Sequence, residues 1–86
     1  MPIEDVLSSR GRVKILRILA EIGELNISEI ARRAGLNYAT TQSHLQILES
    51  FGLIGHKKFG RIRIFHFNRS DPRAEAIRNI IDQWTE

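Results

Sequence analysis

The stretch from Asn37 to Phe51, set between Gly35 and Gly52, constrains this chain more than any other. Side chains suited to packing recur in it at three- and four-residue spacing, which gathers them on one side of an α-helix. These are Thr41, His44, Leu45, Leu48 and Phe51. The opposite side carries Ala39, Gln42, Ser43 and Gln46. We therefore expect the chain to fold around a helix with one packing face and one exposed face of hydrogen-bonding side chains.

The first three turns of this helix contain Tyr, Thr, Gln, Ser and His and carry no formal charge. A helix that merely faces water is usually rich in charged side chains on its outer side. Uncharged hydrogen-bonding groups suit contact with the edges of DNA bases. An ordinary polar helix explains the same pattern equally well, so the rest of the chain has to decide.

Size and composition indicate one small domain and exclude several classes of protein. The chain has 86 residues, 42% of them hydrophobic, and no cysteine, so disulfides and thiolate metal sites are excluded. No apolar run approaches the roughly 20 residues that span a bilayer, and residues 1–10 do not resemble a signal peptide. We expect a cytoplasmic protein with no membrane partner. Clustered carboxylates, a nucleophile–histidine pair and a phosphate-binding glycine loop are all missing from the sequence, so an enzyme is not expected.

Positive charge is concentrated in the second half of the chain. The net charge is +3 and the isoelectric point is about 10.0. Between positions 36 and 70, five cations face a single acid, Glu49. This distribution favours a ligand that carries phosphates.

Three helices, the first of them short, and a short extended piece are predicted before the central helix. Residues 2–7 indicate a short helical lead-in, and residues 10–22, capped by Ser8 or Ser9, indicate a longer helix that ends at Gly23. An extended piece at 25–27 precedes a helix at 29–34, with Ser28 as the expected N-cap. Gly35 then suits a left-handed position and Asn37 can cap the next helix. Two helices joined by a short glycine turn are typical of a helix-turn-helix.

A β-hairpin is predicted after the central helix. Residues 53–59 and 61–67 are rich in β-branched and aromatic side chains, and Gly60 between them can adopt the positive φ of a tight turn. Four basic residues lie near the tip: Lys57, Lys58, Arg61 and Arg63. They are either phosphate contacts or charges that only keep an edge strand soluble and unpaired.

A final helix is predicted over residues 73–84, with Ser70 or Asp71 as its cap and Pro72 in its first turn. Its apolar stripe either folds back onto the domain's own core or pairs two copies of the chain. We favour a dimer interface, with the lead-in helix contributing. Its expected residues are Ile3, Leu7, Ile77, Ile80, Ile81 and Trp84. Residues 1–71 and 72–86 are expected to form one structural unit.

The order of these elements describes an α+β, mainly α, winged helix-turn-helix with a C-terminal dimerisation helix. Between Leu7 and Phe67 the sequence also resembles the ArsR-like family of prokaryotic repressors, especially compact archaeal members. The resemblance rests on five separated motifs. They are Arg-x-x-Ile-Leu at 12–16, Ile-Ser-Glu-Ile-Ala-Arg at 27–32, His-Leu-x-x-Leu at 44–48, Gly-Leu-Ile at 52–54 and Gly-Arg at 60–61.

The resemblance implies a dimer that lays the 37–51 helix of each subunit in successive major grooves of double-stranded DNA. Each 53–67 wing would follow the flanking backbone or minor groove. The family's base-reading positions fall on Tyr38, Ala39, Gln42 and Ser43. Backbone contacts are expected from Asn37, Thr40, Gln46, Lys57, Lys58, Arg61, Arg63, Arg32 and Arg33.

The sequence departs from the metal-sensing members of that family. It has no cysteine, and residues 73–86 contain no histidine, so we expect no metal and no cofactor. His44 lies on the packing side and is expected to be a buried or capping residue. The leading prediction is a sequence-specific homodimeric repressor. An architectural DNA-binding protein of low specificity and a winged-helix module for protein interaction remain the alternatives, and the sequence specifies no small-molecule effector.

Overall fold

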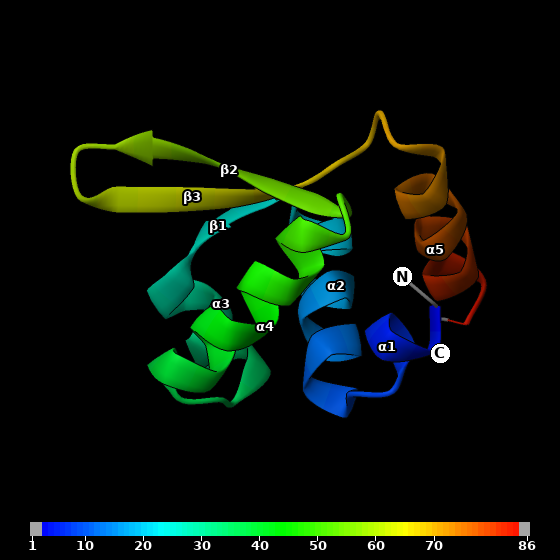
Figure 1. Ribbon diagram of the computed structural model, residues 1–86, viewed down its shortest axis with the longest axis horizontal. Helices are drawn as coiled ribbons and strands as arrows, with labels where there is room; N and C mark the ends of the chain where they lie inside the picture. Colours follow the sequence, from blue (N-terminus) through cyan, green and yellow to red (C-terminus); the bar gives the residue numbers. More distant parts are fainter. Residues whose placement is uncertain (1–2, 85–86) are drawn as a thin grey trace.

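The computed structural model describes residues 3–84 and is mainly helical with one small sheet (Figure 1). Its elements in chain order are α1 (Ile3–Leu7), α2 (Arg10–Ile22), β1 (Glu24–Asn26), α3 (Ile27–Ala34), α4 (Tyr38–Ser50), β2 (Ile54–Phe59), β3 (Ile62–Phe67) and α5 (Pro72–Gln83). This is the predicted winged helix-turn-helix. Pro2, predicted to open the lead-in helix, lies outside the described residues.

Helix α2 lies at the centre, with α4 in front of it and α3 beside it, and the sheet covers one end of these helices (Figure 1). The β2–β3 hairpin extends beyond the helices as a wing. Helices α1 and α5 lie together at the other side of the molecule. Within residues 3–84, no helix is both long enough and apolar enough to span a bilayer.

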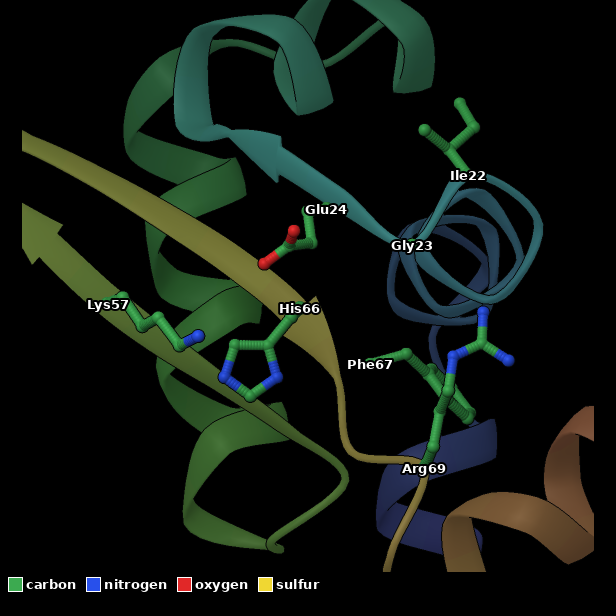
Figure 2. Close-up of a pocket in the computed structure, with 7 residues that line it drawn as sticks. All are labelled: Ile22, Gly23, Glu24, Lys57, His66, Phe67 and Arg69. Atoms are coloured by element: carbon green, nitrogen blue, oxygen red, sulfur yellow. The ribbon is translucent and has the colours of Figure 1, made fainter.

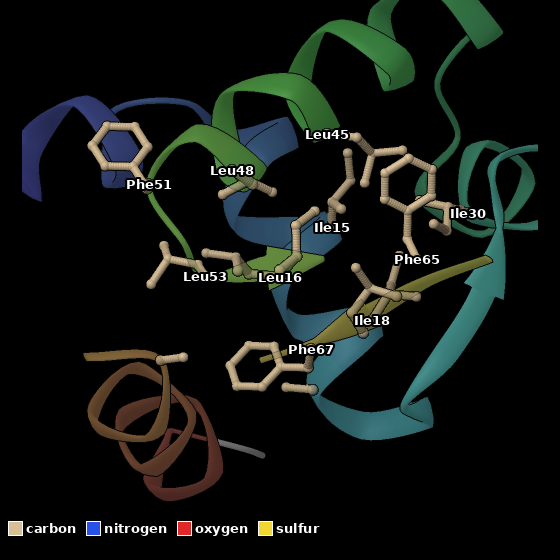
Figure 3. Packing of buried hydrophobic residues seen from close by; sticks show 14 of the residues in the cluster. Ile15, Leu16, Ile18, Ile30, Leu45, Leu48, Phe51, Leu53, Phe65 and Phe67 are labelled. Atoms are coloured by element: carbon tan, nitrogen blue, oxygen red, sulfur yellow. The ribbon is translucent and has the colours of Figure 1, made fainter. Parts of the chain in front are cut away.

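One apolar core joins the helices to the sheet (Figure 3). Its largest fully buried apolar side chains come from α2, α3 and α4 and are Ile15, Leu16, Leu19, Ile30, Leu45 and Leu48. Phe65 and Phe67 of β3 close the core on the sheet side, with 2% and 4% of their surface exposed. Because burial of a Leu, Ile or Phe side chain contributes about 1.5–3 kcal/mol, this cluster fixes how α4 and the wing lie relative to each other.

The helix caps agree with the sequence at three positions and correct it at one. Ser9, Asn37 and Asp71 accept bonds from the first-turn backbone of α2, α4 and α5. The predicted cap Ser28 was wrong, because Asn26 Oδ1 accepts from Glu29 N at 2.8 Å and α3 begins at Ile27. Ile27, predicted as extended, is 95% buried as the first residue of that helix.

The three strands form an antiparallel sheet in the order β1-β3-β2. In the wing, Phe59 pairs with Ile62, and Gly60 and Arg61 form the two-residue loop between them. Gly60 has φ of 62° whereas Arg61 has no positive φ, the pattern of a type II′ turn. The predicted role of Gly60 is confirmed, and the turn holds the two strands in one register.

Candidate nucleic-acid interface

Helix α4 presents the predicted hydrogen-bonding face to solvent. Ala39, Ser43 and Gln46 are exposed and Gln42 is half-exposed, while Thr41, Leu45 and Leu48 on the other side are buried. Tyr38, in the first turn, has 51% of its surface exposed. The predicted division of this helix into an outer and a packing face is confirmed.

Hydrogen bonds and close packing hold α4 in this orientation. The Thr41 hydroxyl, fully buried, donates to the Asn37 carbonyl at 2.8 Å, so a polar residue is accommodated in the core. At the other end of α4, Arg73 Nη2 donates to the Phe51 carbonyl at 2.8 Å and also contacts Asp71. Because Arg73 belongs to α5, this contact ties the last helix to the C-terminus of α4.

His44 lies on the packing side of α4, as predicted. Its Nδ1 is buried and has no hydrogen-bond partner among the described residues. A Cβ added at Gly11 would lie 2.9 Å from His44 Nε2, so Gly11 is what allows α2 to approach this ring. Burial lowers the pKa of His44, and the positive charge of Arg12 lowers it further.

Strand register divides the basic residues of the wing between two faces. Residues paired across antiparallel strands share a face, and faces alternate along each strand. Lys58 pairs with Arg63, on the same face as the buried Phe65 and Phe67, which is the face toward the helices. Lys57 pairs with Ile64 on the opposite, outer face. The sequence grouped these cations together, whereas the structure separates Lys57 from the other two.

An open hollow of about 550 Å³ lies on the outer face, at the base of the wing (Figure 2). Figure 2 shows the side chains of Glu24, Lys57 and His66 on the same side of the sheet. Glu24 and Gly55 both pair with His66, and a Cβ on Gly55 would come within 3.0 Å of the His66 ring. Lys57 and His66 therefore belong to a surface separate from the helix-side face of the wing.

A notch of about 150 Å³ joins the start of α4 to the wing. Its lining brings together three predicted site residues that are far apart in the sequence, Tyr38 from α4 and Arg61 and Arg63 from the wing. The lining is completed by residues that were not predicted for the site: Ile62 of the wing, Asn26 at the end of β1, and Ile27 and Ser28 at the start of α3. Sequence reasoning treated Ser28 only as a cap. One sequence signal was overlooked: Glu29 follows Asn26 by three residues, the spacing of a capping box. This spacing identifies Asn26 as the cap, so the Ser28 hydroxyl is not needed for capping and can face the notch.

Arg32 and Arg33 do not stand free at the end of α3. Both contact the carboxylate of Glu29, Arg33 Nε at 3.1 Å from its Oε1. Hydrogen bonding from Arg32 lowers the pKa of Glu29, and the charges of both arginines act in the same direction. Two cations share one acid, so the cluster keeps a net positive charge.

His56, on the wing, contacts Glu49 of α4 through Nδ1. Its ring lies 5.1 Å from that of Phe65, between centroids. This histidine joins the wing to the central helix. Within residues 3–84 no group of three or more His, Cys, Asp or Glu is arranged to hold a metal ion.

The predicted dimer residues form an apolar surface on α1 and α5. Ile3, Leu7, Ile80 and Trp84 are exposed, Trp84 by 79% of its surface. Ile77 and Ile81 are instead half-buried and pack against the core. A groove of about 240 Å³ runs between the two helices, lined mainly by apolar side chains of Ile3, Val6, Phe51, Leu53, Ala76, Ile77 and Ile80, with Arg73. Part of the stripe thus folds back and part remains uncovered.

Comparison with known proteins identifies the same family that the sequence motifs resemble. The family model described as "Bacterial regulatory protein, arsR family" matches residues 9–55. The HTH-type transcriptional regulator YuzN of Bacillus subtilis is 32% identical over 98% of this chain and 92% of its own length. The cadmium resistance transcriptional regulatory protein CadC of Listeria innocua is also 32% identical, over 72% of this chain and 51% of its own.

One similar solved structure is a dimer. It is the homodimeric winged helix-turn-helix DNA-binding domain Mb0332 of Mycobacterium bovis, a possible ArsR-family regulator. It is 26% identical over 94% of this chain and 69% of its own, with a TM-score of 0.74. These relatives are bacterial, so the compact archaeal subtype stays a prediction. The chain belongs to the arsR family of bacterial regulatory proteins and is a DNA-binding transcriptional regulator.

Proposed function

We propose that this chain is a homodimeric repressor that places α4 in the major groove of its operator and the wing on the flanking backbone or minor groove. The observation that carries the proposal is the notch where the uncharged outer face of α4 meets the basic, helix-side face of the wing. A surface of this kind combines groups that select bases with groups that neutralise phosphates. Occupying promoter DNA would then prevent transcription.

Sequence selection is assigned to the first two turns of α4. Gln42 can contact an adenine bidentately, Ser43 can donate or accept a hydrogen bond, and the Ala39 methyl can meet the methyl group of a thymine. Tyr38 reaches either a base edge or a phosphate, since its ring stands in the notch beside the wing arginines. The exposure of these side chains supports the assignment.

Affinity is assigned to phosphate contacts around this helix. Lys58, Arg61 and Arg63 supply them from the wing, and Arg32 and Arg33 from the end of α3. The polar side chains of Asn37, Thr40 and Gln46 flank the base-reading face and hold the backbone on either side. Lys57 faces away from α4, so among the predicted phosphate contacts it is the one that the strand register supports least.

The assembly is assigned to the apolar surface on α1 and α5. Four large apolar side chains exposed there would be costly in a monomer, and Mb0332 is a homodimer. Two-fold symmetry places the half-sites about 34 Å apart, one turn of DNA. Residues 1–71 and 72–86 act as one structural unit, a view supported by the complete burial of Ala74 of α5 in the shared core. The protein works by binding, without catalysis, in the cytoplasm.

Selection of bound sequences from random duplex DNA tests the proposal. The wild type should enrich one motif, and Gln42→Ala should lose discrimination of about 1–3 kcal/mol at one base position. Arg61→Ala should weaken all sequences alike and reduce the salt dependence. Gln83→Ala, at an exposed position of α5, is the matched control and should change neither. If Gln42→Ala and Arg61→Ala both bind the selected site as the wild type does, the proposed interface is wrong.

A further inference from the structure

The tip of the wing carries two large apolar side chains in the open. Phe59 has 61% of its surface exposed and Ile62 has 55%. They pair directly across the hairpin, immediately before and after the Gly60-Arg61 turn. Exposed hairpin edges usually carry charged side chains that prevent association. An aromatic and an aliphatic side chain paired at this place therefore indicate a surface that binds a partner.

The same tip is strongly basic on its other side. Lys58 and Arg63 pair directly across the strands, an arrangement of like charges that destabilises a hairpin. Neither they nor Arg61 form an ion pair with any residue of the described chain. Arg63 lies over the ring of Phe65, with its guanidinium carbon 5.7 Å from the ring centroid, which leaves its charge without an acidic partner among the described residues. Three cations without an ion pair within six residues favour a polyanion over an apolar protein surface as the partner of the tip.

We propose that Phe59 and Ile62 form an apolar wedge that enters the minor groove of DNA and opens a base step. The proposal rests on the DNA-binding function above and specifies how the wing uses its tip. Minor-groove proteins insert Phe, Leu, Ile, Met or Pro between base steps, which partly unstacks them and kinks the duplex. The cations on the helix-side face and in the turn hold the phosphates on either side of the groove.

The dimensions of the hairpin explain why a wedge is needed. The minor groove of B-DNA is about 6 Å wide, whereas the two strands alone lie about 4.8 Å apart, before their side chains are counted. The tip therefore enters only where the groove widens. Unstacking of one base step by an apolar side chain provides that widening.

The position of the wing makes the insertion compatible with base reading by α4. The hairpin extends beyond the helices (Figure 1), and the notch joins its tip region to Tyr38 at the start of α4. By register Phe59 and Ile62 lie on the outer face with Lys57, but they are the last pair before the turn, whereas Lys57 lies two positions nearer the base of the wing. A wing that enters the groove end-on therefore brings Phe59 and Ile62 to the base pairs and leaves Lys57 outside. One protomer can thus hold the major groove with α4 and the adjacent minor groove with Phe59 and Ile62. The kink would lie beside each half-site.

The bend of a selected duplex, labelled at both ends for energy transfer, tests the wedge in the full-length dimer. The wild type should bend it by roughly 20–90° per kink, and 2-aminopurine at the step under the tip should brighten on binding. Phe59→Ala and Ile62→Ala should reduce the bend and the brightening and weaken binding on the order of tenfold. Both should keep the preferred motif read by Gln42, and Phe59→Leu should retain most of the bend.

Ile22→Ala is the matched control, because Ile22 is exposed at the end of α2, outside the wing. It should bend DNA as the wild type does. If Phe59→Ala and Ile62→Ala keep the full bend, brightening and affinity, the wedge is wrong. If these variants instead fail to bind another protein that the wild type binds, the tip is a site for that protein. Failure of the proposed function is recognised separately, since the wild type would then select no motif at all.

Discussion

The salt dependence of DNA binding should reveal which face of the wing touches the phosphates. Lys58 and Arg63 point to the helix side of the hairpin, while Lys57 points to the outer side, although the three lie within seven positions. All three are single positive charges on one small hairpin. Substitution of any one of them by Ala therefore removes the same charge. Only Lys58→Ala and Arg63→Ala should also remove a contact with a DNA phosphate.

The expected size of the effect follows from counterion release. Each phosphate contact contributes about −0.9 to the slope of log K against log salt concentration, so losing one contact per protomer reduces the slope of a dimer by about 1.8. Between 50 and 200 mM salt, the wild type should then lose about 12-fold more affinity than Lys58→Ala or Arg63→Ala. Lys57→Ala should keep the wild-type slope.

Fluorescence anisotropy of a labelled operator duplex, titrated at four or more salt concentrations, measures these slopes. Thermal unfolding of each variant shows whether the hairpin stays intact. The reasoning from strand register is refuted if Lys57→Ala reduces the slope as much as Lys58→Ala does. It is refuted equally if Lys58→Ala and Arg63→Ala leave the slope unchanged.

Three further predictions concern assembly and stability. Ile80→Asp should sediment as a monomer at micromolar concentration, because it places an acid on the exposed α5 surface, whereas Asn79→Asp should remain dimeric; a dimeric Ile80→Asp contradicts the interface. Asn37→Ala removes the 2.7 Å bond from Thr40 N to Asn37 Oδ1 and should cost about 1 kcal/mol, lowering Tm by about 4–8 °C, while Asn79→Ala should not. The pKa of His44 is lower in the folded state than in the unfolded state, so the unfolded state binds a proton more readily. The contribution of neutral His44 to the free energy of unfolding is therefore complete above about pH 6.5 and declines as the pH falls below that value. Chemical denaturation of His44→Gln across pH 5–8 should show a flatter pH profile, and parallel profiles would exclude His44 as the cause.

Local chemistry made much of the fold predictable. Asn37, Gly35 and Gly60 each met a specific backbone requirement, a cap or a positive φ, and each is found in that role. The period of the apolar residues likewise identified the buried side of α4. The start of α3 was missed because Asn26 and Ser28 are both good caps, and the capping-box spacing from Asn26 to Glu29 was not used; the burial of Ile27 also selects Asn26.

The candidate site was less predictable, since it depends on distances through space. Nothing in the sequence places Tyr38 beside Arg61 and Arg63, or leaves Ser28 facing the same notch. The pairing of Arg32 and Arg33 with one carboxylate is also a matter of side-chain geometry. The half-burial of Ile77 and Ile81 depends on where α5 docks, and the stripe alone left both outcomes open.

The sequence by itself determined the elements, their order and the family, because caps, turns and hydrophobic periods act over three to seven residues. The tertiary structure decided which side chains share a surface. A difference of one position in the wing sends Lys57 to the outer face and Lys58 toward α4, and this becomes meaningful only once β3 has paired with both neighbours and buried Phe65 and Phe67. Burial of that one face orients the sheet, and the orientation selects which charges can meet DNA.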